Sequence, residues 1–227
     1  MSQKSNTFTI GARDAKYLAD VVLAAMSKDD VTPALTAARL TISDDKKTLT
    51  GISTDRYRVH EAYVALEKAS SVHEILVPRD AWSWLSRAAL SFSGRRSRVS
   101  APVVKFTSRP VDEQGEGYLK IEVIQHRDTG PEAGSLARVG TLRKANFPPV
   151  DRLIREARAA ELQTGELRLN PDLLAGLRPL MPFPMFAPTM RPTKTENPNK
   201  PGPVLFEFAT PGKVHAVALI QPNLFLP

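Results

Sequence analysis

The chain of 227 residues contains no cysteine, which excludes disulfide bridges and thiolate metal sites. Long apolar runs are also lacking. None approaches the roughly 20 residues that a membrane-spanning helix needs, and residues 1–6 carry no apolar signal region. These absences argue against secretion and membrane insertion, and they predict a cytoplasmic protein.

Recognisable catalytic arrangements are missing as well. The four histidines are scattered, without the spacing that places two metal ligands on one helical face. Ser53, Asp55 and His60 are close in sequence, but no glycine-flanked serine elbow is present, and strand alternation would separate their side chains. A phosphate-binding Gly-x-x-x-x-Gly-Lys segment is also absent. The sequence therefore predicts a non-enzymatic protein without cofactor or metal.

What the chain does have is apolar content and positive charge. A hydrophobic fraction of 42% is enough for a core in one large domain or two small ones. The formal net charge is +7 and the pI is near 9.8, which favours polyanionic partners. Nucleic acid is the first candidate, although many basic proteins bind none.

A strand followed by an amphipathic helix recurs along the chain. The three strand–helix pairs cover residues 7–26, 74–90 and 167–181. Each helix starts near an aspartate, Asp14, Asp80 or Asp172, whose carboxylate can accept hydrogen bonds from free backbone N–H groups. The strands expected after the helices are residues 38–43, 48–53, 57–66, 103–107, 118–124, 204–210 and 214–220. This recurrence predicts an internal repeat of one strand, one helix and an antiparallel meander.

Two segments interrupt the repeat. Residues 125–135 are polar and contain two glycines and a proline, which predicts a mobile loop. Residues 182–203 contain seven prolines among 22 residues, too many for a helix or a central strand. Because this segment also carries apolar side chains, a flexible tether and an extension packed against the body are equal alternatives.

Three short motifs, taken together with the repeat, resemble the bacterial DNA polymerase III beta sliding clamp family. Residues 54–59 read Thr-Asp-Arg-Tyr-Arg-Val, against Thr-Asp-Gly-His-Arg-Leu in the family. Residues 147–149 read Phe-Pro-Pro, followed by apolar Leu153 and Ile154, against a Phe-Pro-Asp motif. Residues 219–225 combine an apolar run, a proline and a final apolar residue, as the family's last strand does.

The resemblance implies an α+β sliding-clamp (DNA clamp) fold built from repeated β-α-β-β-β units. Antiparallel sheets would lie outside, and helices would face a central hole. A complete domain of two units would span residues 1–160. A partial domain with one unit and the proline-rich insertion 182–203 would span residues 161–227. The family has three full domains, so the first would be absent here.

In the family, the three motifs converge on a hydrophobic pocket that receives short linear peptides from polymerases, the clamp loader and repair proteins. The pocket residues that the resemblance implies here are Leu35, Thr54, Arg56, Tyr57, Arg58, Val59, Pro148, Leu153, Leu219, Ile220, Gln221, Pro222 and Asn223. Arg56 departs from the family, because it replaces a glycine, removes backbone freedom and adds a cation beside the pocket.

Basic residues offer contacts for DNA phosphates. Between Arg87 and Arg109 the chain has basic residues and no acidic one, which indicates either a solvated loop or a patch that contacts phosphates without sequence preference. Other basic residues lie on or beside helices that the resemblance places at the hole. The predicted DNA-binding residues are Arg13, Lys16, Arg79, Arg87, Arg95, Arg96 and Arg98.

These features predict a processivity factor that encircles double-stranded DNA as a homo-oligomeric ring. It would tether DNA polymerase through the pocket, with a clamp loader as a further partner. Three units per chain would need four copies to reach the twelve units of known rings, and a hidden fourth unit would give a trimer. The resemblance implies a location at the nucleoid, or in the host cytoplasm for a bacteriophage version.

Two other interpretations remain open. A clamp-derived adaptor or decoy would bind clamp-motif peptides without encircling DNA. An unrelated basic α+β protein would bind DNA and make no use of the pocket.

Overall fold

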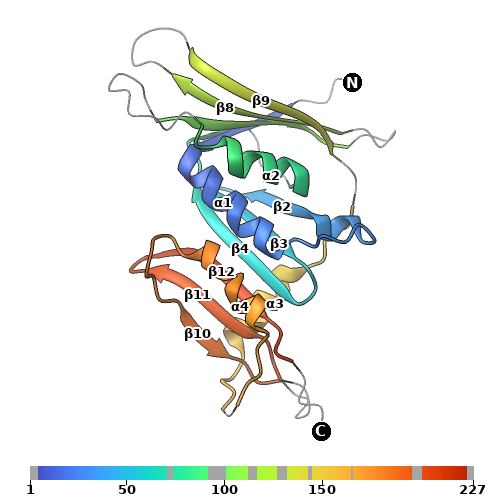
Figure 1. The fold of residues 1–227 in the computed structure, drawn as a ribbon, viewed down its shortest axis with the longest axis vertical. Helices are drawn as coiled ribbons and strands as arrows, with labels where there is room; N and C mark the ends of the chain where they lie inside the picture. Colours follow the sequence, from blue (N-terminus) through green and yellow to red (C-terminus); the bar gives the residue numbers. More distant parts are fainter. Residues whose placement is uncertain are drawn as a thin grey trace.

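The computed structural model describes residues 5–70, 74–91, 101–111, 117–126, 132–142, 145–164, 166–195 and 201–223. Two antiparallel sheets and the helices packed on them form an α+β molecule that is elongated in Figure 1. Within the described residues, no helix is both long enough and apolar enough to cross a bilayer.

The smaller sheet has the strand order β5-β1-β7-β8-β9. Its strands are β1 (Asn6–Gly11), β5 (Lys68–Ala69), β7 (Val103–Arg109), β8 (Gly117–His126) and β9 (Glu132–Leu142). The larger sheet has the order β10-β11-β12-β4-β3-β2-β6. Its strands are β2 (Ala37–Ile42), β3 (Thr48–Thr54), β4 (Arg58–Ala65), β6 (Ile75–Pro78), β10 (Thr189–Pro192), β11 (Val204–Thr210) and β12 (Lys213–Ile220).

The helices lie on both faces of the larger sheet. They are α1 (Ala12–Ala25), α2 (Arg79–Ala88), α3 (Val150–Ala159) and α4 (Pro171–Ala175), with the 3-10 turns η1 (Pro33–Thr36) and η2 (Arg178–Leu180). Helices α1 and α2 pack against each other and contact both sheets. Their apolar faces, with Leu18 and Trp82 fully buried, form the main core together with Phe106 of the smaller sheet.

The first two repeat units exchange their first strands. Strand β1 of the first unit pairs with β7 of the second, with Phe8 opposite Phe106. Strand β6 of the second unit pairs with β2 of the first, with Val77 opposite Ala38. Each unit therefore completes the other's sheet, and the two units share one core.

The third unit extends the sheet of the first. Strand β12 pairs with β4, with Leu219 opposite Val59. The strand predicted at residues 167–169 is wrong, because these residues form no strand in the structure. The helix predicted to follow it is divided into α4 and η2, and Pro179 inside η2 lacks the N–H that a continuous helix would use.

Helix α3 is an element that the sequence analysis did not predict. Its buried residues Val150, Ile154 and Ala157 recur at helical spacing and pack on the outer face of the larger sheet. Arg39 of β2 donates a hydrogen bond to Asp151, and Arg158 Nε lies 2.9 Å from Glu207 Oε1 of β11. These contacts fix α3 across β2, β4 and β11.

The predicted loop at residues 125–135 is largely strand. Strand β8 continues to His126 and β9 begins at Glu132, while residues 127–131 lie outside the described residues. Polar composition was a poor guide for the start of β9, because β9 lies at the edge of the smaller sheet and polar residues are common there.

The described part of the proline-rich segment packs against the body. Strand β10 lies at the edge of the larger sheet, where a proline at the strand end costs no sheet hydrogen bond. The ring of Phe186 lies 6.4 Å from that of Phe208 in β11. The packed alternative is therefore confirmed for these residues.

Candidate functional site

A cavity of about 580 Å³ opens where the β3–β4 corner, α3 and the end of β12 meet. We call it the corner cavity. Its lining residues are Arg56, Tyr57, Arg58, Val59, Leu153, Glu156, Ala157, Ala160, Thr193, Lys194, Thr195, Pro201, Pro203, Leu219 and Gln221. The lining therefore combines four segments of the chain, residues 56–59, 153–160, 193–203 and 219–221.

The β3–β4 corner is held in shape by its own side chains. Asp55 Oδ1 accepts hydrogen bonds from the backbone N–H groups of Tyr57 and Arg58, both at 3.1 Å. Thr54 Oγ1 donates to the carbonyl of Arg58 at 2.7 Å and accepts from the N–H of Arg56 at 3.2 Å. Such bonds from short polar side chains stabilise a tight turn, so the corner presents a defined wall to the cavity.

Arg56 adopts the left-handed conformation at this corner, with φ of 80°. A side chain in that conformation costs about 1–2 kcal/mol relative to the right-handed region, and glycine avoids this cost. The backbone thus keeps the geometry that a glycine would favour. Arg56 is one of the lining residues, and its guanidinium Nη2 donates to Thr32 Oγ1 at 2.6 Å.

The floor of the cavity is apolar. Val59 and Leu219, opposite each other in β4 and β12, are buried together with Ala157 of α3. Leu153 lines the cavity with 47% of its surface exposed. Gln221 closes the end of β12, because its N–H donates to the carbonyl of Tyr57 at 2.9 Å and its Nε2 donates to the carbonyl of Pro201 at 3.0 Å. An apolar floor with polar and charged residues around it suits a peptide that carries apolar anchor side chains.

Several residues implied by the resemblance meet in the corner cavity. They are Arg56, Tyr57, Arg58, Val59, Leu153, Leu219 and Gln221. Thr54 does not line it but supports the corner. Ile220 is buried on the opposite face of β12 in the main core.

The remaining implied residues lie outside the lining. Leu35 is buried in η1, and the carbonyl of Pro148 accepts a hydrogen bond from Val150 at the start of α3. Pro222 is buried after β12, and the N–H of Asn223 donates to the carbonyl of Arg168.

Apart from Leu153, sequence reasoning missed the lining residues from the α3 region and from the proline-rich segment. Glu156 and Ala157 lie in α3 and Ala160 directly follows it, while the proline-rich segment gives Thr193, Lys194, Thr195, Pro201 and Pro203. The apolar spacing of α3 was a signal that could have revealed the first group. The second group becomes visible only through tertiary packing.

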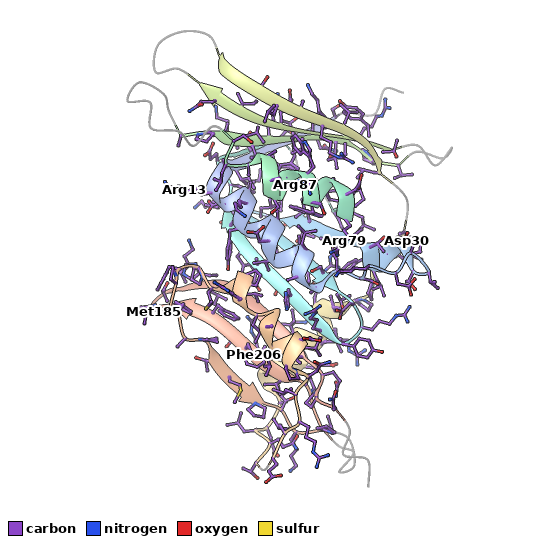
Figure 2. The ribbon with its side chains drawn as sticks, viewed as in Figure 1. Arg13, Asp30, Arg79, Arg87, Met185 and Phe206 are labelled. Carbon is purple, nitrogen blue, oxygen red and sulfur yellow. The ribbon has the colours of Figure 1, made fainter. Side chains whose placement is uncertain are left out.

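The predicted DNA-contacting residues have different surroundings. Arg13 on α1 and Arg87 on α2 are exposed on two helices that pack against each other (Figure 2). Lys16 Nζ lies 2.7 Å from Asp20 Oδ2. Arg79 Nη1 donates to the carbonyl of Met26 at 3.0 Å, so part of this guanidinium caps the end of α1. Arg95, Arg96 and Arg98 lie outside the described residues.

A shallow hollow of about 700 Å³, which we call the basic hollow, runs along the exposed side of α1. Its lining residues are Arg13, Lys16, Tyr17, Asp20, Leu23, Ala24, Leu90, Arg178, Pro179 and Met181. Arg178 comes from η2 of the third unit, and sequence reasoning missed it. The hydroxyl of Tyr17 donates to the carbonyl of Leu180 at 2.8 Å, which holds η2 beside α1.

Two buried ionisable groups lie on β4 behind the corner. Burial lowers the pKa of His60 to about 3, and its Nδ1 is 3.2 Å from the carbonyl of Val21. Glu61 lies on the face of β4 opposite His60, where burial raises its pKa and it accepts a hydrogen bond from the Tyr63 hydroxyl. Both groups therefore favour their neutral forms in the folded protein.

No protein-family model and no curated protein matches the chain. Solved structures do match. A putative DNA polymerase III beta subunit from Eubacterium rectale has a TM-score of 0.61 and 10% identity, over 99% of this chain and 67% of that chain. A DNA polymerase sliding clamp from Pseudomonas aeruginosa has a TM-score of 0.63 and 13% identity, over 98% and 68%.

A sliding clamp (DNA polymerase III subunit beta) from P. aeruginosa bound to griselimycin also matches. Its TM-score is 0.60 and its identity is 17%, over 96% of this chain and 65% of that chain. These likenesses span nearly the whole chain and show that it has the sliding-clamp fold, as the resemblance predicted.

Proposed function

We propose that the chain is a sliding-clamp-like processivity factor. In this function, copies of the chain form a ring around duplex DNA and tether a DNA polymerase through a peptide bound in the corner cavity. The protein performs no chemistry of its own. A short linear motif on the polymerase or clamp loader supplies apolar side chains to the cavity floor.

The observation that carries this proposal is the convergence at the corner cavity. Residues 56–59, Leu153, Leu219 and Gln221 come from the three motifs that resemble the clamp family, and they line one apolar cavity. The fold around it is that of sliding clamps. A partly exposed leucine beside a buried apolar floor is a suitable docking place for the anchor residues of a peptide.

The exposed helix faces support the DNA-binding half of the proposal. Arg13, Arg87 and Arg178 come from α1, α2 and η2, and the first and last of these line the same hollow. Phosphate contacts of this kind are weak and independent of sequence. Such contacts suit a ring, because closure around the duplex rather than affinity keeps a ring on DNA.

Threading onto linear DNA tests the ring without a loader. A duplex is fixed to beads at one end, the protein is added, and the free end is then blocked by a bound antibody. We expect retention through a high-salt wash when the end is blocked, and loss after a restriction enzyme cuts the duplex. Binding that high salt removes regardless of the block would overturn encirclement.

A second candidate is an adaptor or decoy that binds clamp-motif peptides without encircling DNA. The corner cavity supports this candidate as well, because its lining lies within one chain and peptide binding there requires no ring. In the threading experiment this candidate gives no salt-resistant retention, although the corner cavity still binds peptide.

A further inference from the structure

The charged residues around the corner cavity are not neutralised equally. Its lining contains three cations, Arg56, Arg58 and Lys194, and one carboxylate, Glu156. The carboxylate has its own partner, because Glu156 Oε1 is 2.6 Å from Arg152 Nε. The cavity therefore has an excess of positive charge beside an apolar floor.

Arg58 and Lys194 each have a carboxylate partner within the chain. Arg58 Nε is 2.9 Å from Asp55 Oδ2, and both side chains are less than one-fifth exposed. The end of α4 also confines Arg58, since a Cβ at Gly176 would lie 2.3 Å from its Nη1. Lys194 Nζ is 3.2 Å from Glu161 Oε2. Neither cation is free to turn toward a ligand without losing its carboxylate.

Arg56 differs, because within the described residues its guanidinium forms no ion pair. Its side chain has one recorded hydrogen bond, from Nη2 to the neutral Thr32 hydroxyl. A guanidinium has five N–H donors in a planar fork that matches a carboxylate. The strained backbone at φ of 80° places this side chain at the cavity edge, and the Thr54 hydroxyl holds the backbone there.

We infer that the corner cavity selects peptides carrying an acidic residue beside their apolar anchors, with Arg56 binding the carboxylate. This inference rests on the proposed function, because it names the partner chemistry of the same site. The apolar anchors lie on Val59, Leu153 and Leu219, and the carboxylate reaches the guanidinium at the edge. Arg56 thus determines specificity, while Arg58 and Asp55 position the corner.

Two matched peptides test the inference. Both are short and fluorescein-labelled, with a leucine and a phenylalanine as anchors, and they differ by one aspartate or asparagine next to the leucine. Fluorescence anisotropy is measured with the wild-type chain at low salt. We expect the aspartate peptide to bind about five-fold more tightly, because an exposed ion pair has a modest strength. The preference should shrink as salt rises.

Variants of the chain assign the preference to one residue. Arg56→Gln should bring the affinities for the two peptides to within about two-fold of each other, whereas Arg56→Lys should keep part of the preference. Arg155→Gln is the matched control, because Arg155 is an exposed arginine of α3 that lies outside the cavity lining, and it should leave the preference intact. Circular dichroism melting confirms that each variant is folded.

The outcomes separate this inference from the proposed function. Equal affinity of the wild-type chain for both peptides, or an unchanged preference in Arg56→Gln, would overturn the role of Arg56 and leave the cavity as a peptide site. Absence of binding by either peptide at high micromolar protein would overturn both.

Discussion

Arg56 shows how one residue can preserve a backbone geometry at an energetic cost. Its φ of 80° lies in the left-handed region, and the hydroxyl of Thr54 and the carboxylate of Asp55 hold the corner around it. A long side chain at such a position is strained relative to glycine. The corner therefore stays in place while its outer edge gains a cation.

Comparing Arg56→Gly with Arg56→Ala isolates this strain. Both variants lose the guanidinium and its bond to Thr32, and only glycine relieves the backbone. We expect the glycine variant to have a free energy of unfolding about 1 kcal/mol higher than the alanine variant, measured by urea denaturation. Equal stability of the two variants would show that the left-handed backbone at residue 56 carries no strain.

His60 makes the stability of the fold depend on pH. Its pKa is about 3 in the folded chain, against 6.5 for an ordinary histidine, because it is buried. Between these values only the unfolded chain takes up the proton. The free energy of unfolding therefore decreases as the pH falls below about 6.5. Glu61 acts in the opposite direction, since its raised pKa favours folding when the carboxyl is protonated.

Urea denaturation at pH 7 and pH 5 tests the role of His60. From the pKa difference, the wild-type chain should lose about 2 kcal/mol more than a His60→Gln variant over this interval. Glu61 is present in both proteins, so its titration cancels in the comparison. Parallel pH dependence of the two proteins would contradict the assignment.

Helix α3 is the element that turns a sheet surface into a cavity. Its buried face covers Ile52, Val59 and Leu205, and its exposed Leu153 and Glu156 form one side of the opening. The ion pair between Arg39 and Asp151 fixes the start of the helix. Without α3, the outer face of β4 and β12 would be an open apolar surface.

Truncation of Leu153 and truncation of Ile154, its neighbour in α3, should therefore have different effects on the free energy of unfolding. Ile154→Ala should lower the free energy of unfolding by about 2–4 kcal/mol, because Ile154 is only 2% exposed. Leu153→Ala should cost less than about 1 kcal/mol, because Leu153 is 47% exposed. Chemical denaturation of both variants checks the order, and similar losses would mean that α3 is packed differently.

Leu153 can also be changed to test binding at the corner cavity. Leu153→Ser should weaken binding of the aspartate peptide about ten-fold, because the substitution removes an apolar contact with a peptide anchor. Leu162→Ser is the control, since Leu162 is similarly exposed and lies outside the lining. Anisotropy should show the control within two-fold of the wild-type chain, and an equal effect of both changes would contradict the assignment.

At the scale of the whole molecule, the exchanged strands and the shared sheet determine which surfaces are available. Strands β1 and β6 join the first two units, and β12 on β4 adds the third. The corner cavity uses the outer side of the larger sheet, where α3 packs, and the basic hollow runs along α1 on the other side. The proposed peptide site and the proposed DNA site therefore lie on opposite sides of this sheet, so the proposed function involves no competition between the two ligands.

The salt dependence of DNA binding tests the basic hollow. Replacing Arg13 and Arg178 with glutamine should reduce the slope of log affinity against log salt by about 2, because each arginine releases about one counterion on contacting a phosphate. Arg155→Gln on the exposed side of α3 is the matched control and should leave the slope unchanged. Equal slopes in all three proteins would place the DNA elsewhere.

The sequence by itself determined the local elements. Alternating apolar residues predicted β2, β3, β4, β7, β8, β11 and β12, and helical spacing predicted α1 and α2. The polar run at residues 54–59 marked the corner, because Asp55 and Thr54 stabilise a turn within a few residues of chain. Such features follow from the sequence because their interactions are between neighbours.

Only the tertiary structure decided which distant residues meet. The exchange of β1 and β6, the use of Arg79 to cap α1, and the position of the proline-rich segment beside Leu219 depend on contacts between segments far apart in the chain. Ile220 and Leu219 are adjacent and equally apolar, yet strand pleating sends one into the main core and the other to the cavity. Sequence composition cannot assign the two faces, because each is defined by what packs against it.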